Sequence, residues 1–89
     1  MNFLTIIGTI KNLIINKDKD SIIELCVDDT AYQGNLNQNE YQYISVYANS
    51  EIFSRELKLL QKNLIIGIKG RIENRQGNLV VIAERVRPF

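Results

Sequence analysis

The tyrosines are the residues of this sequence whose type and spacing most clearly suggest a chemistry. All four lie between positions 32 and 47, and Tyr41, Tyr43 and Tyr47 fall two or four residues apart in a stretch typical of a strand. Side chains alternate across a strand, so these three rings share one face and the apolar residues between them share the other. A row of flat, polar-tipped rings suits stacking on unpaired bases, because every base has a π-face. With Tyr32 a short loop upstream, all four rings are candidate nucleic-acid contacts.

The same pattern has a purely structural interpretation. Tyrosine is a favoured strand residue, and the second face of a strand is often packed by a helix, a loop or a partner chain. The tyrosine pattern alone slightly favours the structural interpretation, so the rest of the chain has to decide between the two.

Missing residue types exclude most catalytic chemistry. The chain has no histidine, and its single cysteine, Cys26, cannot form an internal disulfide. Without histidine the usual zinc sites, the Ser/His/Asp and Cys/His arrangements and the commonest general base are absent. Cys26 lies among apolar residues and is expected to be a small buried side chain. We therefore expect a protein that is not an enzyme and uses neither a metal nor a cofactor.

Length and composition predict one globular domain over residues 1–89. The hydrophobic content of 45% is ordinary for a chain that forms a modest core. No apolar run approaches the length of a membrane span, and the first residues lack the charged region and cleavage site of a signal peptide. We expect a cytoplasmic protein with no membrane partner.

The charge is nearly balanced overall but unevenly divided along the chain. The net charge is +1, yet residues 1–54 hold three basic and seven acidic residues, whereas residues 55–89 hold eight basic and three acidic ones. The second part is expected to supply a basic surface, unless the fold interleaves the two parts and cancels the field.

The spacing of apolar residues predicts five strands and one helix. Asn49 and Ser50 offer N-cap oxygens to the helix, Asn63 tolerates the left-handed geometry of a C-cap, and Gly8 predicts a bulge or bend in the first strand. The expected strands cover residues 2–13, 22–28, 41–48, 64–73 and 79–87, with the helix over about 49–62 and a turn over 74–78. This order matches an all-β, five-stranded OB-fold barrel with its helix between strands three and four. It also places the tyrosine strand where OB folds present a ligand, which favours the nucleic-acid interpretation.

Basic residues on the predicted outward faces are candidate phosphate contacts. Lys69, Arg71 and Arg75 lie opposite the apolar face of the fourth strand, and Lys11 lies opposite that of the first. Neutralising about three or four phosphates would give a slope of log affinity against log salt of about −2 to −3 for single strands. An ordinary solvated strand face is the alternative for these four residues.

Three segments together resemble the bacterial single-stranded DNA-binding protein family over nearly the whole chain. They are Asn2–Gly8, which is similar to that family's opening strand, Tyr41–Tyr47, which is similar to its aromatic third strand, and Lys62–Ile72, which is similar to its helix end and fourth strand. The resemblance implies the same OB fold and a role in binding single-stranded DNA.

The resemblance also implies roles for individual residues. Tyr41 and Tyr47 fall where the family places base-stacking aromatic residues, and Tyr32 lies near another such position. Tyr43 occupies a position that is often basic in the family, and Arg75 matches a basic residue at the mouth of the last hairpin.

The sequence departs from the family pattern in three respects. The connection at 74–78 is short and has no stacking aromatic residue, tyrosine stands where the family has tryptophan, and the end at Val86-Arg87-Pro88-Phe89 lacks the family's linker and acidic tip. These departures imply a smaller wrapping surface and weaker individual stacking platforms.

The sequence therefore predicts sequence-tolerant binding of single-stranded DNA in replication, recombination or repair. Within the same fold, the alternative is a primosome-type accessory protein that mainly binds protein partners. A structural, oligomerising module is an alternative from another class, and RNA is an alternative ligand. The long apolar first strand, like the family, predicts a homo-oligomer, either a dimer or a tetramer. Replication or repair proteins are the other expected partners.

Overall fold

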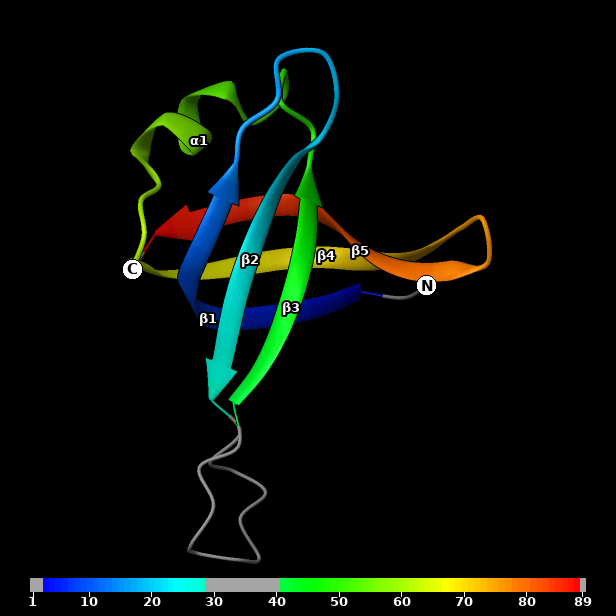
Figure 1. Ribbon diagram of the computed structural model, residues 1–89, viewed down its shortest axis with the longest axis horizontal. Coiled ribbons are helices and arrows are strands. Elements are labelled where there is room, and N and C mark those ends of the chain that lie inside the picture. The colour runs from blue at the N-terminus through cyan, green and yellow to red at the C-terminus, as the bar shows by residue number, and fades with distance from the viewer. Residues whose placement is uncertain (1–2, 29–40, 89) are drawn as a thin grey trace, which may run out of the picture.

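Five strands close into a barrel in the computed structural model, which describes residues 3–28 and 41–88. The strand order around the barrel is β1-β2-β3-β5-β4, and all neighbouring strands are antiparallel except β3 and β5, which are parallel. The elements are β1 (Phe3–Ile14), β2 (Ser21–Asp28), β3 (Tyr41–Ala48), α1 (Ser54–Leu59), β4 (Ile65–Arg75) and β5 (Asn78–Pro88). The predicted all-β barrel, with a helix between the third and fourth strands, is confirmed (Figure 1).

Strand β1 belongs to both halves of the barrel. Its residues from Phe3 to Thr9 pair with β4, and those from Thr9 to Ile14 pair with β2. Figure 1 shows the result, with β2 and β3 crossing β4 and β5 at a steep angle. The predicted irregularity near Gly8 is seen as a register shift between Ile10 and Asn12. At Gly8 itself the two strands approach closely, since a Cβ there would lie only 2.9 Å from the carbonyl oxygen of Cys26. Glycine therefore allows β2 to approach β1 where β1 changes partner.

The core consists of the inward-facing residues of all five strands and three residues from the helical segment. The predicted inward faces of the first four strands are confirmed at their centres, where Ile10, Ile23, Val46 and Ile68 are fully buried. Cys26 is also buried, as predicted. The core residues are Ile6, Ile10, Ile23, Leu25, Val46, Ala48, Phe53, Leu57, Leu60, Ile66, Ile68, Ala83 and Val86.

The helix is shorter than the sequence predicts. Asn49 acts as an N-terminal cap for the turn before α1, because its Oδ1 accepts hydrogen bonds from the amides of Glu51 and Ile52, each at 3.0 Å. At the other end Leu60 is already extended, with φ −83° and ψ 145°. The early end has a tertiary cause, since Ile10 accepts a hydrogen bond from the Asn63 amide at 2.8 Å and donates one to the Leu64 carbonyl at 2.9 Å. These bonds draw the chain out of the helix and into β4.

Asn63 and the last hairpin show which local predictions were correct. Asn63 has the expected left-handed geometry, with φ 73°, but it lies in a turn beyond the helix and not at its C-cap. The last connection is a two-residue turn at Gln76 and Gly77, with φ of 54° and 85°, so β4 and β5 extend into the predicted turn over 74–78. Positive φ at both central residues is the geometry that fits the twist of a β-hairpin.

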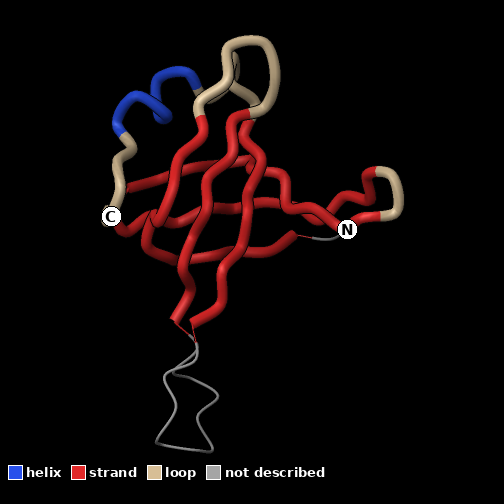
Figure 2. Tube along the Cα trace, viewed as in Figure 1, coloured by secondary structure: helices blue, strands red, loops and turns tan. Residues whose placement is uncertain are grey.

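Most of the described chain is strand, and α1 lies at the end of the barrel where the β1–β2 connection turns (Figure 2). No helix within residues 3–28 and 41–88 is long and apolar enough to cross a membrane.

Candidate nucleic-acid interface

The outward face of β3 carries the tyrosines that the structure describes. Tyr43 is 67% exposed and Ser45 is exposed, whereas Tyr47 is half-buried. The backbone of Tyr41 opens β3 opposite Asp28, and its side chain lies outside the described part. Tyr32 lies wholly outside the described residues. The alternation predicted from the sequence is therefore confirmed for Tyr43 and Tyr47.

Strand register places Tyr47 across one strand from Arg71, and a ring contact joins it to Arg75. On β5 its neighbour is Ile82, which pairs in turn with Arg71 on β4. The guanidinium carbon of Arg75 lies 5.7 Å from the centre of the Tyr47 ring. Such a contact is a cation–π interaction. Tyr47, Arg71 and Arg75 thus form one group, although Tyr47 comes much earlier in the sequence than the two arginines.

The other two predicted basic residues lie farther from the rings of β3. Lys69 is on β4, where its amino group lies 5.0 Å from the centre of the Phe3 ring, and Phe3 itself pairs with Arg71. Lys11 is on the outer side of the β1 bulge, with β2 between it and β3. Neither lysine has a carboxylate partner among the described residues. Lys69 extends the group around Arg71, whereas Lys11 stands apart.

Both arginines are already paired with carboxylates. Arg71 forms ion pairs with Glu73 and, at 3.3 Å, with Glu84. Arg75 Nη1 lies 3.1 Å from Asp20 Oδ2, and Arg75 Nε lies 3.1 Å from Glu73 Oε1. A phosphate would therefore compete with these carboxylates for the two guanidinium groups.

These ion pairs shift the ionisation of the groups involved. Hydrogen bonds from Arg71 and Arg75 hold the pKa of Glu73 below its usual value, because they stabilise its charged form. Hydrogen bonds to Glu73 and Asp20 raise the pKa of Arg75 for the same reason. Both shifts favour the charged forms of Glu73 and Arg75, which therefore remain ionised near neutral pH.

The sequence interpretation missed the acidic members of this cluster. Glu73 was detectable, because it lies two residues from both Arg71 and Arg75 and so shares their face of the strand. Asp20 and Glu84 were not, because their pairing depends on how separate strands and loops meet. Arg75 and Asp20 are 55 positions apart in the chain.

The β1–β2 connection holds Asp20 through a network of hydrogen bonds. The Ser50 hydroxyl donates to the Lys19 carbonyl at 2.6 Å and shares a 2.7 Å hydrogen bond with the Ser21 hydroxyl. Asn16 donates from its side chain to the Asp20 carbonyl at 2.8 Å. Ser21 is fully buried, and its hydroxyl also accepts from the Asn16 amide. This network ties the connection to the segment that follows β3.

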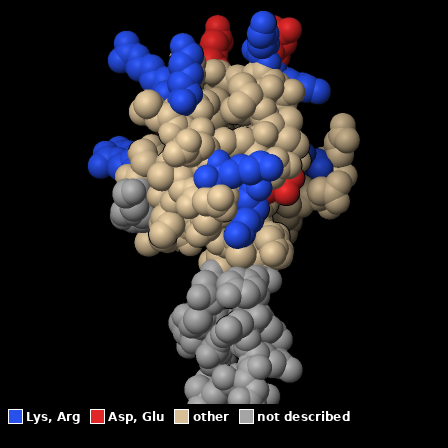
Figure 3. Space-filling view, turned by 60° about the vertical axis from the view of Figure 1, so that its left-hand side comes forward, with Lys and Arg blue, Asp and Glu red and all other residues tan. Residues whose placement is uncertain are grey.

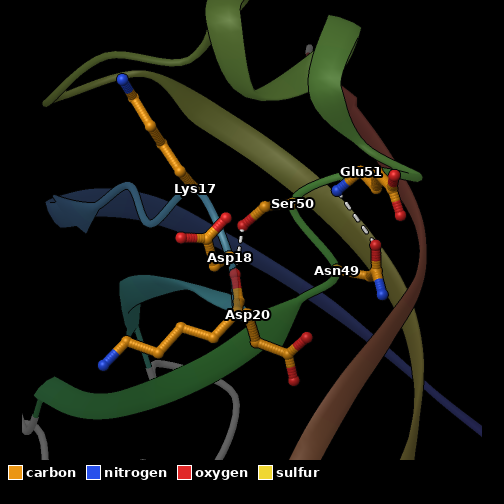
Figure 4. Close-up of a pocket in the computed structure, with 7 residues that line it drawn as sticks. Lys17, Asp18, Asp20, Asn49, Ser50 and Glu51 are labelled. Carbon is orange, nitrogen blue, oxygen red and sulfur yellow. Dashed lines mark hydrogen bonds between the residues drawn. The ribbon is translucent and has the colours of Figure 1, made fainter.

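A polar cleft of about 530 Å³ separates these two segments. Figure 4 shows the Ser50 side chain reaching across it and Asn49 bonded to the Glu51 amide. Basic and acidic side chains are mixed in its lining, which consists of Lys17, Asp18, Lys19, Asp20, Asn49, Ser50 and Glu51. Within the part of the chain that the structure describes, no group of side chains suits a metal ion.

The surface charge is divided and not gathered into a single patch. On the face shown in Figure 3, Lys and Arg side chains stand in separate groups, with acidic side chains beside some of them. The ion pair between Asp20 and Arg75 joins the acidic first part of the chain to the basic second part. The fold therefore partly neutralises the basic surface that the uneven charge of the sequence predicts.

Neither a protein-family model nor a curated protein matches the sequence. Solved structures match the fold. A chain of the Stn1–Ten1 complex of S. pombe gives a TM-score of 0.70 at 14% identity over 100% of this chain, which spans 59% of that chain. The mitochondrial single-stranded DNA-binding protein Rim1 of S. cerevisiae gives 0.75 at 8% identity, covering 99% of this chain and 93% of that one.

The N-terminal domain of PriB from Thermoanaerobacter tencongensis, a dimeric structure, gives a TM-score of 0.71 at 16% identity, covering 99% of this chain and 96% of that one. At these identities the similarity establishes the fold, which is the five-stranded OB barrel with its helix between β3 and β4.

Proposed function

We propose that this protein binds single-stranded DNA with little sequence preference. Bases would stack on the outward face of β3, and basic residues on the neighbouring strands would hold phosphates. The observation that carries the proposal is the position of Tyr43 and Tyr47 on that face of an OB barrel, with Tyr47 beside Arg75. The description of Rim1 as a single-stranded DNA-binding protein supports the same ligand.

Stacking supplies most of the affinity in this proposal. Tyr43 is the most accessible described ring of β3, and one base on a tyrosine is worth about 1–3 kcal/mol. Tyr41 and Tyr32 are proposed to extend the row, as the sequence predicts. RNA is the alternative ligand, because an aromatic platform accepts either nucleic acid unless a residue reads the 2′-OH.

Phosphate contacts come from two kinds of basic residue. Lys69 and Lys11 have no carboxylate partner within the described ranges, so neither would give up an ion pair to contact a phosphate. Arg71 and Arg75 would exchange carboxylates for phosphates. The DNA transactions that expose single strands, namely replication, recombination and repair, are the proposed setting, and the cytoplasm is the proposed location.

We propose that the protein works as a homo-oligomer. The outward side of β1 and β4 presents apolar side chains, with Ile7 55% exposed, Ile65 50% exposed and Phe3 49% exposed. These residues lie on adjacent paired strands, where Thr9 pairs with Ile65 and Ile7 pairs with Gly67. Exposed apolar side chains gathered on neighbouring strands favour an interaction site.

The same apolar surface favours a second candidate function. An accessory OB protein that mainly binds protein partners would use this surface as its principal contact, and PriB is a solved example of the fold. Tight binding to a replication or repair protein, together with weak binding to oligonucleotides, would favour this second function over the first.

A fluorescence titration tests the proposed function. Tyrosine emission is recorded while oligo-dT is added at two salt concentrations, for the native protein and for the Tyr41→Ala and Tyr47→Ala variants. Strong quenching that both variants reduce is the expected result, because bases stacked on a ring change its emission. Binding with no quenching, or variants that behave as the native protein does, would place the bases elsewhere.

A further inference from the structure

The guanidinium of Arg75 lies over the ring of Tyr47. Its central carbon is 5.7 Å from the ring centre. A base between them would need roughly two stacking intervals of about 3.4 Å, or about 7 Å. The space between Arg75 and the ring face that it covers is therefore too narrow for a base until Arg75 moves.

Two carboxylates from different elements hold Arg75 in this position. Asp20, from the β1–β2 connection, contacts Nη1 at 3.1 Å, and Glu73, from β4, contacts Nε at 3.1 Å. Asp20 is itself fixed, because its carbonyl accepts from Asn16 and the neighbouring Ser21 bonds to Ser50. The hairpin end of β4 is thereby tied to a connection that comes much earlier in the chain.

We infer that Asp20 and Glu73 hold Arg75 as a latch over Tyr47, so that the stacking face of this ring is closed in the free protein. This inference rests on the proposed function, because covering the ring matters only if bases stack on it. An arriving strand stacks first on Tyr43, which is open, and reaches Tyr47 only after a phosphate has replaced the carboxylates on Arg75. Asp20 is then a positioning residue that lowers affinity while the latch is closed.

The latch is tested first without DNA. In a background with Tyr32, Tyr41 and Tyr43 changed to phenylalanine, Tyr47 is the sole tyrosine, and acrylamide quenching reports its accessibility. Asp20→Asn is compared with Asp18→Asn, which removes the same charge from the same connection but has no ion pair in the described structure. Asp20→Asn is expected to increase the quenching constant, whereas Asp18→Asn leaves it unchanged. Equal quenching in all three proteins, with folding verified by circular dichroism, overturns the latch.

The second arm measures binding to oligo-dT. Asp20→Asn removes one exposed ion pair, and with it part of the restraint that keeps Arg75 over Tyr47. The variant should therefore bind oligo-dT about twofold to fivefold more tightly. Asp18→Asn is expected to show only a smaller charge effect. In a Tyr47→Ala background, Asp20→Asn should increase the affinity no more than Asp18→Asn does. A larger increase for Asp20→Asn in that background would show that Asp20 does not act through Tyr47.

The two arms separate the inference from the proposed function. If no variant binds oligo-dT, the proposed function is wrong, and the quenching comparison still decides whether Asp20 keeps Arg75 over Tyr47. If oligo-dT binds but Asp20→Asn and Asp18→Asn are indistinguishable in both arms, the latch is wrong and the proposed function stands.

Discussion

At the scale of single residues, the partner of each side chain decides what it is free to bind. Tyr43 and Tyr47 lie on the same face, yet one ring is open and the other is covered by Arg75. Strand alternation predicted the shared face, because it is a property of the local backbone. The cover on Tyr47 could not be predicted, because it depends on Asp20, which reaches Arg75 through the tertiary fold.

The acid sensitivity of the fold is predicted to depend on Glu73. Its pKa is lower in the folded protein than the usual 4.5, so it stabilises the fold above that pH, and the stabilisation is lost as the pH falls through the folded value. Glu73→Gln removes this contribution. The melting temperature of the native protein should therefore fall more steeply on acidification below about pH 4.5 than that of the variant.

Thermal melts followed by circular dichroism across this pH range measure the difference. Asp18→Asn is the control, since Asp18 has no ion pair within the described residues, and it should follow the native curve. Parallel acid curves for the native protein and Glu73→Gln would contradict the assigned role of the two arginines.

At the scale of elements, local pattern predicted the strands better than the end of the helix and the length of the last turn. The strand residues alternate, so each predicted strand lies within about two residues of the observed one. The helix end failed because Ile10 on β1 bonds to Asn63 and Leu64, and no local pattern contains that information. The last turn lies within the predicted range but is shorter, because Gln76, a residue without strong turn character, adopts positive φ beside Gly77.

The β4–β5 pairing should be sensitive to one glycine. A Cβ at Gly70 would lie 2.6 Å from the backbone carbonyl oxygen of Ile82, where nothing flexible can yield. Gly70→Ala is therefore expected to lower the free energy of unfolding by about 1–3 kcal/mol, the usual cost of overpacking. Urea denaturation measures this change.

Gly77→Asn in the same hairpin is the matched control for Gly70→Ala. Its Cβ would meet nothing within 4 Å, and asparagine tolerates positive φ at this turn position. It should change the free energy of unfolding far less than Gly70→Ala. Equal losses in the two variants would show that the contact at Ile82 is not the cause.

At the scale of the whole molecule, the fold redistributes the charge. The sequence is acidic in its first part and basic in its second, yet Asp20 and Arg75 meet, and Arg71 pairs with Glu73 and Glu84. This leaves Lys11 and Lys69 as predicted phosphate contacts without carboxylate partners in the described structure. Stacking, and not net charge, should therefore dominate ligand binding.

The salt dependence of binding follows from this arrangement. If about three or four phosphates are neutralised, the slope of log affinity against log salt for a single strand should be about −2 to −3. Titrations of oligo-dT at several salt concentrations measure it. A much steeper slope, together with indifference to Tyr47→Ala, would show that charge and not stacking holds the strand.

The assembly state should depend on the apolar outward side of β1 and β4. Sedimentation of the native protein at micromolar concentration should show a dimer or tetramer, and Ile7→Asp should shift it to a monomer by placing a charge among apolar side chains. Leu79→Asp is the control, because Leu79 is 74% exposed but lies at the start of β5 beside the hairpin turn. A monomeric native protein would contradict the assembly proposal.

The affinity of oligo-dT for the Tyr43→Ala and Tyr43→Phe variants is the most direct measurement of base stacking on β3. Tyr43 is 67% exposed, so neither change should disturb the core. Tyr43→Ala is expected to lose about 1–3 kcal/mol of binding free energy, whereas Tyr43→Phe, which keeps the ring, should bind almost as the native protein does. Equal affinity for all three proteins would show that the outward face of β3 is not where this protein holds a strand.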